Sequence, residues 1–112
     1  MDPERVARNE ATFREANEII ERAAEKAGAT GPVPFICECA EQGCRDVIRL
    51  TLEEYEQVRT NAAWFAVAHG HEHAAGDYGE VVERNAEFVL VAKTDEAASV
   101  AEELDPRAPQ GC

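Results

Sequence analysis

Three cysteines are the residues of this chain with the most specific chemistry. Cys37, Cys39 and Cys44 lie in the stretch FICECAEQGC, and three histidines follow at alternate positions: His69, His71 and His73. Cys37 and Cys39 are two residues apart, so on an extended strand their thiols leave the same face. The polar segment 40–43 ends in glycine, which favours a reversal that returns Cys44 to them. Three thiolates and one imidazole form a Cys3His shell, which zinc favours in structural sites.

Other interpretations of the thiols stay open beside metal binding. Small buried hydrophobic residues are one, although the interleaved Glu and Gln make a poor core pattern. A disulfide or metal-free redox switch is another, with Cys44 pairing with Cys37 or Cys39. Thiolates also bind iron–sulfur clusters, but the chain has no fourth cysteine nearby, so we favour zinc.

A catalytic metal is a further alternative. If a strand continued through the histidines, they would share one face and resemble an all-histidine catalytic site, but Gly70 makes a turn equally compatible. Catalytic zinc keeps an open position for water, whereas three cysteines and one histidine close the shell. Glu38 and Glu72 lie beside ligand positions and would be general bases if the site were open. On a strand, Glu38 points away from the cysteines, so we expect a solvated carboxylate there.

The composition indicates a small acidic domain. Among 112 residues, 45% are hydrophobic, and 23 acidic residues against 11 basic ones give a formal net charge of −12. This charge argues against nucleic acid and anionic membranes as partners and fits a basic protein partner better. No apolar run reaches the ~20 residues of a membrane span. The N-terminus lacks a secretory pattern, so we expect a cytoplasmic protein with reduced cysteines and a free terminal thiol at Cys112.

The first predicted element is an amphipathic helix over residues 3–27. Asp2 is a suitable N-cap, Pro3 fits the first helical position, and Gly28 can end the helix. One apolar stripe is predicted to face the core, with charged residues on the opposite face. Its members are Val6, Phe13, Ala16, Ile20, Ala23 and Ala27.

The remaining pattern predicts strands and two short helices. Five segments have strand character: residues 33–38, 47–50, 64–68, 79–84 and 88–93. The first two form a hairpin with the cysteine loop at its tip, and the last two turn at Asn85–Ala86. Between the second and third strands, Thr51 and Glu54 form a capping box that starts a helix ending near Asn61. Its predicted inward residues are Leu52, Tyr55 and Val58.

This order predicts an α+β fold with a mainly antiparallel sheet, and with the long N-terminal helix and the short second helix packed on one face. We expect residues 1–94 to form a single zinc-stabilised domain. Residues 95–112 then form an acidic helix and tail, of which 105–112 are expected to be disordered.

The chain resembles a group of small, uncharacterised actinobacterial proteins over residues 8–93. The resemblance rests on these groups: Arg8-Asn9-Glu10 with Phe13 and Arg14, Phe35-x-Cys37-Glu38-Cys39 with Cys44, Leu50 with Glu54-Tyr55-Glu56-x-Val58-Arg59, Phe65-x-Val67, Gly70-His71-Glu72, Val81-Val82-Glu83-Arg84, and Lys93. It implies His71 as the fourth ligand, because His71 is the histidine of the Gly-His-Glu group. It implies no activity.

We therefore expect Cys37, Cys39, Cys44 and His71 to bind one structural zinc. The expected role is that of a protein–protein interaction or regulatory module, acting through the acidic surface or the N-terminal helix, in a monomer or homodimer. A zinc-linked thiol redox switch is the alternative, and a small zinc-dependent hydrolase or lyase is less favoured. Enzymatic activity is left open, with a non-enzyme preferred.

Overall fold

A computed structural model of the chain describes residues 3–39, 41, 43–73 and 79–107. The elements follow one another as α1 (Pro3–Lys26), β1 (Val33–Ile36), β2 (Val47–Leu50), α2 (Leu52–Val58), β3 (Trp64–Val67), the 3₁₀ turn η1 (His71–His73), β4 (Gly79–Arg84), β5 (Val89–Lys93) and α3 (Asp95–Glu103). The predicted α+β class is confirmed. Expectations for Asp2 and Cys112 lie outside the described residues, as do those for residues 108–111.

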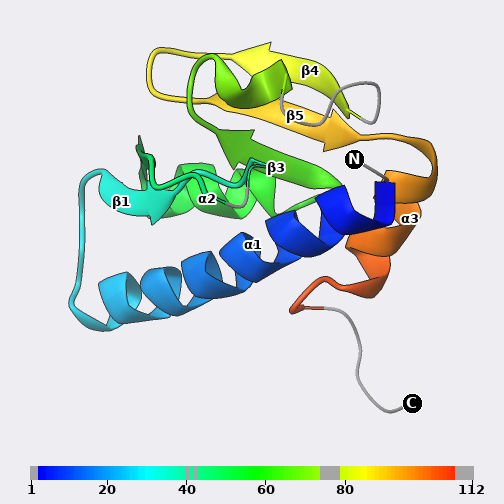
Figure 1. Cartoon of the computed structure of the whole chain (residues 1–112). Helices are drawn as coiled ribbons and strands as arrows, with labels where there is room; N and C mark the ends of the chain where they lie inside the picture. Colours follow the sequence, from blue (N-terminus) through cyan, green and yellow to red (C-terminus); the bar gives the residue numbers. More distant parts are fainter. Residues whose placement is uncertain (1–2, 40, 42, 74–78, 108–112) are drawn as a thin grey trace.

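The strands form two antiparallel sheets (Figure 1). β1 and β2 pair as a hairpin, and the second sheet has the order β3-β5-β4. The cysteine segment, Cys37–Cys39, follows β1 and connects the two sheets, because the backbone N–H of Glu38 donates to the carbonyl of Ala66 in β3 at 2.9 Å. β4 lies on the far side of the second sheet from α1 (Figure 1). The cysteine segment therefore lies between the two sheets.

Helix α2 begins as its sequence predicts. The Thr51 hydroxyl accepts a hydrogen bond from the Glu54 N–H at 3.1 Å, and the Glu54 carboxylate accepts one from the Thr51 N–H at 2.8 Å. Tyr55 and Val58 are buried, and the ring of Tyr55 stacks on Phe35 with centroids 4.5 Å apart. The helix thus attaches to the first hairpin by an aromatic contact.

The apolar core comes mostly from the strands and α2. Its largest fully buried apolar side chains include Tyr55, Phe35, Phe65 and Leu50. Among the described side chains of α1, the partly buried Ile20 and Ala24 pack against the margin of this core. The fully buried side chains described on α1 are of another kind.

The buried face of α1 is polar, which corrects the predicted apolar stripe. Its buried residues are Glu10, Arg14, Asn17, Glu18 and Glu21, whereas Ala23 and Ala27 are exposed and Phe13, Ala16 and Ile20 are half-buried. The side chain of Val6 lies outside the described part. Periodicity failed here because the surface under α1 presents carbonyl oxygens and charged groups that its polar side chains pair with.

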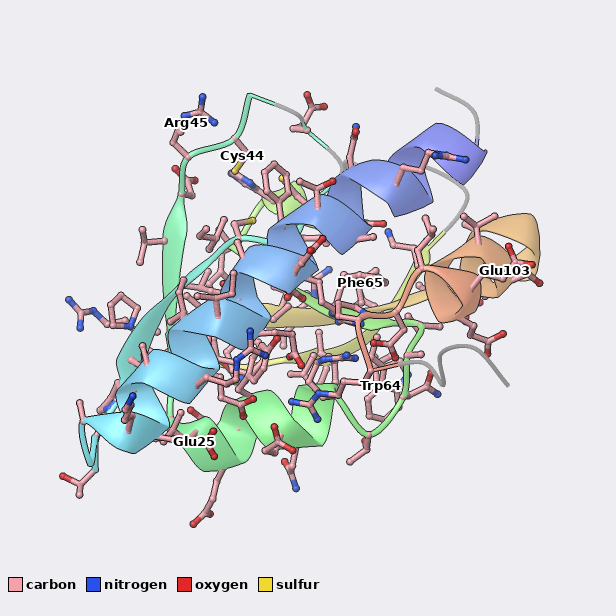
Figure 2. The ribbon with its side chains drawn as sticks, turned by 90° about the horizontal axis from the view of Figure 1, so that it is seen from below. Glu25, Cys44, Arg45, Trp64, Phe65 and Glu103 are labelled. Carbon is pink, nitrogen blue, oxygen red and sulfur yellow. The ribbon has the colours of Figure 1, made fainter. Side chains whose placement is uncertain are left out.

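Arg14 is the central residue of this polar face. Its guanidinium donates to the carbonyls of Ala62, at 3.0 Å, and Trp64, and pairs with Glu38 at 3.2 Å. The same group lies 3.9 Å from the centroid of the Phe65 ring, beside α1 in the view from below (Figure 2). This cation–π contact and the hydrogen bonds together hold α1 against β3.

Glu38 is fully buried, so the expectation of a solvated carboxylate was wrong. One carboxylate oxygen accepts from Arg14 and from the Ala66 N–H at 3.1 Å, and the other accepts from Asn17 at 2.9 Å. The prediction failed because β1 ends at Ile36, and because the facing helix carries a cation and an amide where a solvent-exposed face was assumed.

A second polar cluster fastens the end of α3 to α1 and α2. The Glu18 carboxylate accepts hydrogen bonds from Tyr55 at 2.6 Å, Arg59 at 3.1 Å and Arg107 at 2.6 Å. Burial alone would raise the pKa of Glu18, but these bonds hold it below its ordinary value. Arg59 also pairs with Asp105. The expected disorder of 105–112 is therefore wrong for Asp105 and Arg107.

Replacing Glu38 by Gln should lower the free energy of unfolding by about 3 kcal/mol, because Arg14 would stay buried without its counter-charge. Urea unfolding followed by circular dichroism measures the loss. The matched control is Glu25→Gln on the exposed part of α1, which should change stability by less than about 0.5 kcal/mol. Equal effects of the two substitutions would contradict the central position of Glu38.

Ionisation of the buried Glu10 should lower the free energy of unfolding as pH rises through neutrality. Burial raises its pKa from 4.5 to about 7, although Lys93 lies 2.7 Å from its carboxylate. A raised pKa means that the folded state holds the proton more tightly than the unfolded chain. The contribution of this proton to the free energy of unfolding is fully present below pH 4.5 and is lost as pH rises through about 7. Glu10→Gln should flatten that slope in thermal unfolding, and an unchanged slope would contradict it.

Candidate metal centre

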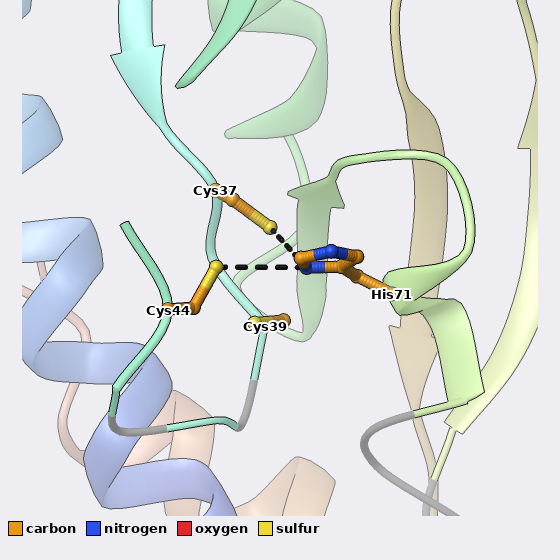
Figure 3. Close-up of side chains that lie close together, drawn as sticks. All are labelled: Cys37, Cys39, Cys44 and His71. Carbon is orange, nitrogen blue, oxygen red and sulfur yellow. Dashed lines mark hydrogen bonds between the residues drawn. The ribbon is translucent and has the colours of Figure 1, made fainter. Parts of the chain in front are cut away.

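The four side chains predicted as ligands meet between the two sheets. Cys37 and Cys39 follow β1, Cys44 precedes β2, and His71 lies at the start of η1 after β3. Figure 3 shows the cysteine thiols and the His71 ring converging from these segments. No two of their ligand atoms are more than 4.8 Å apart. This Cys3His group has the composition and proximity to hold a metal ion.

The distances within the group resemble the edges of a metal tetrahedron. The sulfur atoms of Cys37 and Cys44 each lie 3.5 Å from Nδ1 of His71. Typical zinc–ligand bond lengths in tetrahedral geometry place sulfur and nitrogen about 3.5 Å apart and two sulfurs about 3.8 Å apart. The four ligand atoms all lie within 4.8 Å of one another, which exceeds the sulfur–sulfur edge by about 1 Å at most. The donor set therefore fits one tetrahedral ion.

Backbone hydrogen bonds fix the segments that carry these ligands. The Cys37 N–H donates to the Asp46 carbonyl at 2.9 Å, and the Cys44 N–H donates to the Glu41 carbonyl at 3.0 Å. The Ala68 N–H points at the Cys37 sulfur, 3.2 Å away, where it would stabilise a thiolate. Gly70 has φ of +90°, a conformation that favours glycine, and turns the chain so that His71 faces the cysteines.

Asp46 is a site residue that sequence reasoning missed. Its carboxylate lies 3.0 Å from Nε2 of His71, the ring nitrogen that does not face the cysteines. Carboxylates in this position orient metal-binding histidines and fix the tautomer that leaves the other nitrogen free to ligate. Asp46 follows Cys44 by two residues, but nothing in the spacing identified its partner across the fold.

The three thiols change one another's pKa values. Hydrogen bonding from Cys37 lowers the pKa of Cys39 to about 5, and the same interaction with burial raises the pKa of Cys37. Burial also raises the pKa of Cys44. The hydrogen bond between Cys37 and Cys39 thus favours the thiolate form of Cys39 and the protonated form of Cys37. A divalent cation would remove this competition, because its charge stabilises several thiolates together.

The other residues considered for chemistry point elsewhere. Nε2 of His69 lies 3.3 Å from the carbonyl of Ala86, and the side chain of His73 lies outside the described part. Glu72 accepts hydrogen bonds from Arg84 at 2.5 Å and from the Gly70 N–H at 2.7 Å. The Arg84 bond lowers the pKa of Glu72 to about 2, which makes it a weak base.

No protein-family model, curated protein or solved structure matches this chain. The resemblance to the small actinobacterial proteins therefore stays a prediction. Among the described residues, no helix combines the length and apolar character needed to cross a bilayer.

Asp46→Asn should weaken metal binding by about ten-fold while leaving the four side chains that could ligate in place. Competition with a chromophoric chelator measures the affinity. Glu87→Gln removes the same charge from an exposed turn and should leave the affinity unchanged. If both variants lose affinity equally, the effect comes from net charge and the orienting role of Asp46 is refuted.

Proposed function

We propose that the chain is a zinc-binding protein in which Cys37, Cys39, Cys44 and His71 hold one structural Zn²⁺. The observation that carries this proposal is the convergence of three sulfurs and one imidazole nitrogen within 4.8 Å of one another, with the sulfurs of Cys37 and Cys44 each 3.5 Å from Nδ1 of His71. Soft thiolates with a single imidazole select zinc among common cellular divalent ions. An iron–sulfur cluster is disfavoured because the site offers three thiolates and one histidine.

The zinc is proposed to be structural because its shell would be closed. Four protein ligands leave no position for a water nucleophile. The two carboxylates that could act as bases are also engaged, Glu38 by Arg14 and Asn17, and Glu72 by Arg84. These contacts weigh against the hydrolase or lyase alternative. The metal would instead tie the first hairpin to the segment after β3 and add its binding free energy to folding.

The cellular role that we propose is protein–protein interaction. The chain carries a formal charge of −12, and several large apolar side chains are exposed outside the core. They are Ile19, Val47, Val81, Val82 and Leu104. A rigid, metal-tied scaffold with an acidic and partly apolar surface is suited to a basic partner.

Native mass spectrometry of the purified chain is expected to find one zinc per chain, lost on acid denaturation with four free thiols recovered. Cys39→Ser should lower zinc content and melting temperature together, because the metal contributes to folding. His69→Asn is the matched control and should change neither. A chain that keeps its melting temperature after zinc removal would overturn the structural role, and a mass two hydrogens light would indicate a disulfide.

A second function is supported by the partial exposure of Cys44 beside two buried thiols. In a zinc-linked thiol switch, hydrogen peroxide would oxidise two thiolates to a disulfide between Cys44 and Cys37 or Cys39. Two protons and one peroxide would become two waters, and the zinc would be released. Zinc release at low peroxide, measured with a chelating dye, supports the switch. Retention of zinc at high peroxide refutes it.

A further inference from the structure

A groove of about 590 Å³ lies between α2 and the three-stranded sheet, and none of its lining residues belongs to the metal centre. Its volume is in the range of sites that hold small ligands or side chains. Apolar lining comes from Val58 of α2, Trp64 of β3 and Val82 of β4, together with Phe88 and Leu90. The groove is therefore built from secondary structure that the core holds in place.

The rim of the groove is acidic. Glu54 and Glu83 line it, and no Lys, Arg or His is among the described residues that do so. Glu83 is exposed and has no ion-pair partner in the described part of the chain. Glu54 uses one carboxylate oxygen to accept the Thr51 N–H, which fixes the position of its carboxylate. Charge and shape thus define a site for an occupant that is both cationic and apolar.

Trp64 gives the groove a chemical preference. Alternation along β3 puts Trp64 and Phe65 on opposite faces of the sheet. Phe65 already has the Arg14 guanidinium 3.9 Å from its centroid, on the α1 side. Trp64 lines the groove, is only partly buried, and has no cation at its ring within the part of the chain that the structure describes. A groove lined by an indole and two carboxylates is a favourable environment for a guanidinium or ammonium group.

We propose that this groove binds an arginine or lysine side chain of a partner protein, with apolar residues flanking that side chain. The charge of −12 favours the approach of such a basic segment. Val82, which is 47% exposed, offers a contact for the flanking apolar residues. The inference specifies the partner chemistry of the proposed interaction function and rests on that function.

The test uses the sole tryptophan of the chain, Trp64, as the reporter of the groove. The peptide acetyl-Leu-Arg-Leu-amide is titrated into the full chain while indole fluorescence is recorded. The comparison peptide replaces arginine with citrulline, which has nearly the same shape and no charge. The arginine peptide should bind about five-fold more tightly, and its affinity should fall as salt is added. Equal affinities, or no fluorescence change with either peptide, would overturn the proposal.

Glu83→Gln should weaken binding of the arginine peptide about two- to five-fold and leave the citrulline peptide unaffected. Glu80→Gln is the matched control, because Glu80 lies on the same strand and is exposed but does not line the groove. Equal weakening of arginine-peptide binding by both variants would show that net charge alone causes the effect, and it would refute the proposed binding site in the groove.

Zinc content is measured on the same samples, so that the two proposals fail separately. One zinc per chain without discrimination between peptides refutes the groove alone. Selective arginine binding by a folded chain that holds no zinc refutes the structural-zinc proposal and supports the groove.

Discussion

The buried carboxylate of Glu38 is the constraint on which the rest of the structure depends. A charge without solvent is costly unless it is paired and hydrogen-bonded. Arg14, Asn17 and the Ala66 N–H meet this requirement together, and they come from α1 and β3. Because Glu38 lies between Cys37 and Cys39, the contacts that satisfy it also fix the cysteine segment. The position of two thiols is therefore tied to the docking of the N-terminal helix.

The attachment of α1 follows a different principle from the rest of the fold. The apolar core is formed by the strands and α2, whereas the buried residues described on α1 are polar and make ion pairs and hydrogen bonds. Such contacts are directional, and a shift of one residue in the helix would leave buried charges unpaired. We infer that the polar layer specifies the register of α1 more than it adds stability. Arg107 extends the same arrangement to the end of α3 by pairing with Glu18 and Glu21.

The metal centre and the groove both offer negatively charged groups to a cation. At the metal centre, a cation would balance clustered thiolates, and Asp46 completes the site by orienting His71. At the groove, carboxylates remain on the rim with no cation among the described lining residues. The indole of Trp64 and the ring of Phe65 lie on opposite faces of the three-stranded sheet, and Arg14 occupies the Phe65 face.

The sequence by itself determined the elements whose signals are local. The Thr51–Glu54 capping box, the β4–β5 hairpin and the convergence of Cys37, Cys39 and Cys44 all depend on short spacings. Tertiary structure alone decided the pairing of charges distant in sequence. Glu38 was expected in solvent, and α1 was expected to bury an apolar stripe. Both expectations failed because sequence periodicity does not show which groups lie opposite a given face. Arg14 and Glu38 are 24 residues apart, and only the docking of α1 on β3 makes them partners. The Asp46 contact with His71 has the same origin, since a turn after β3 delivers the histidine.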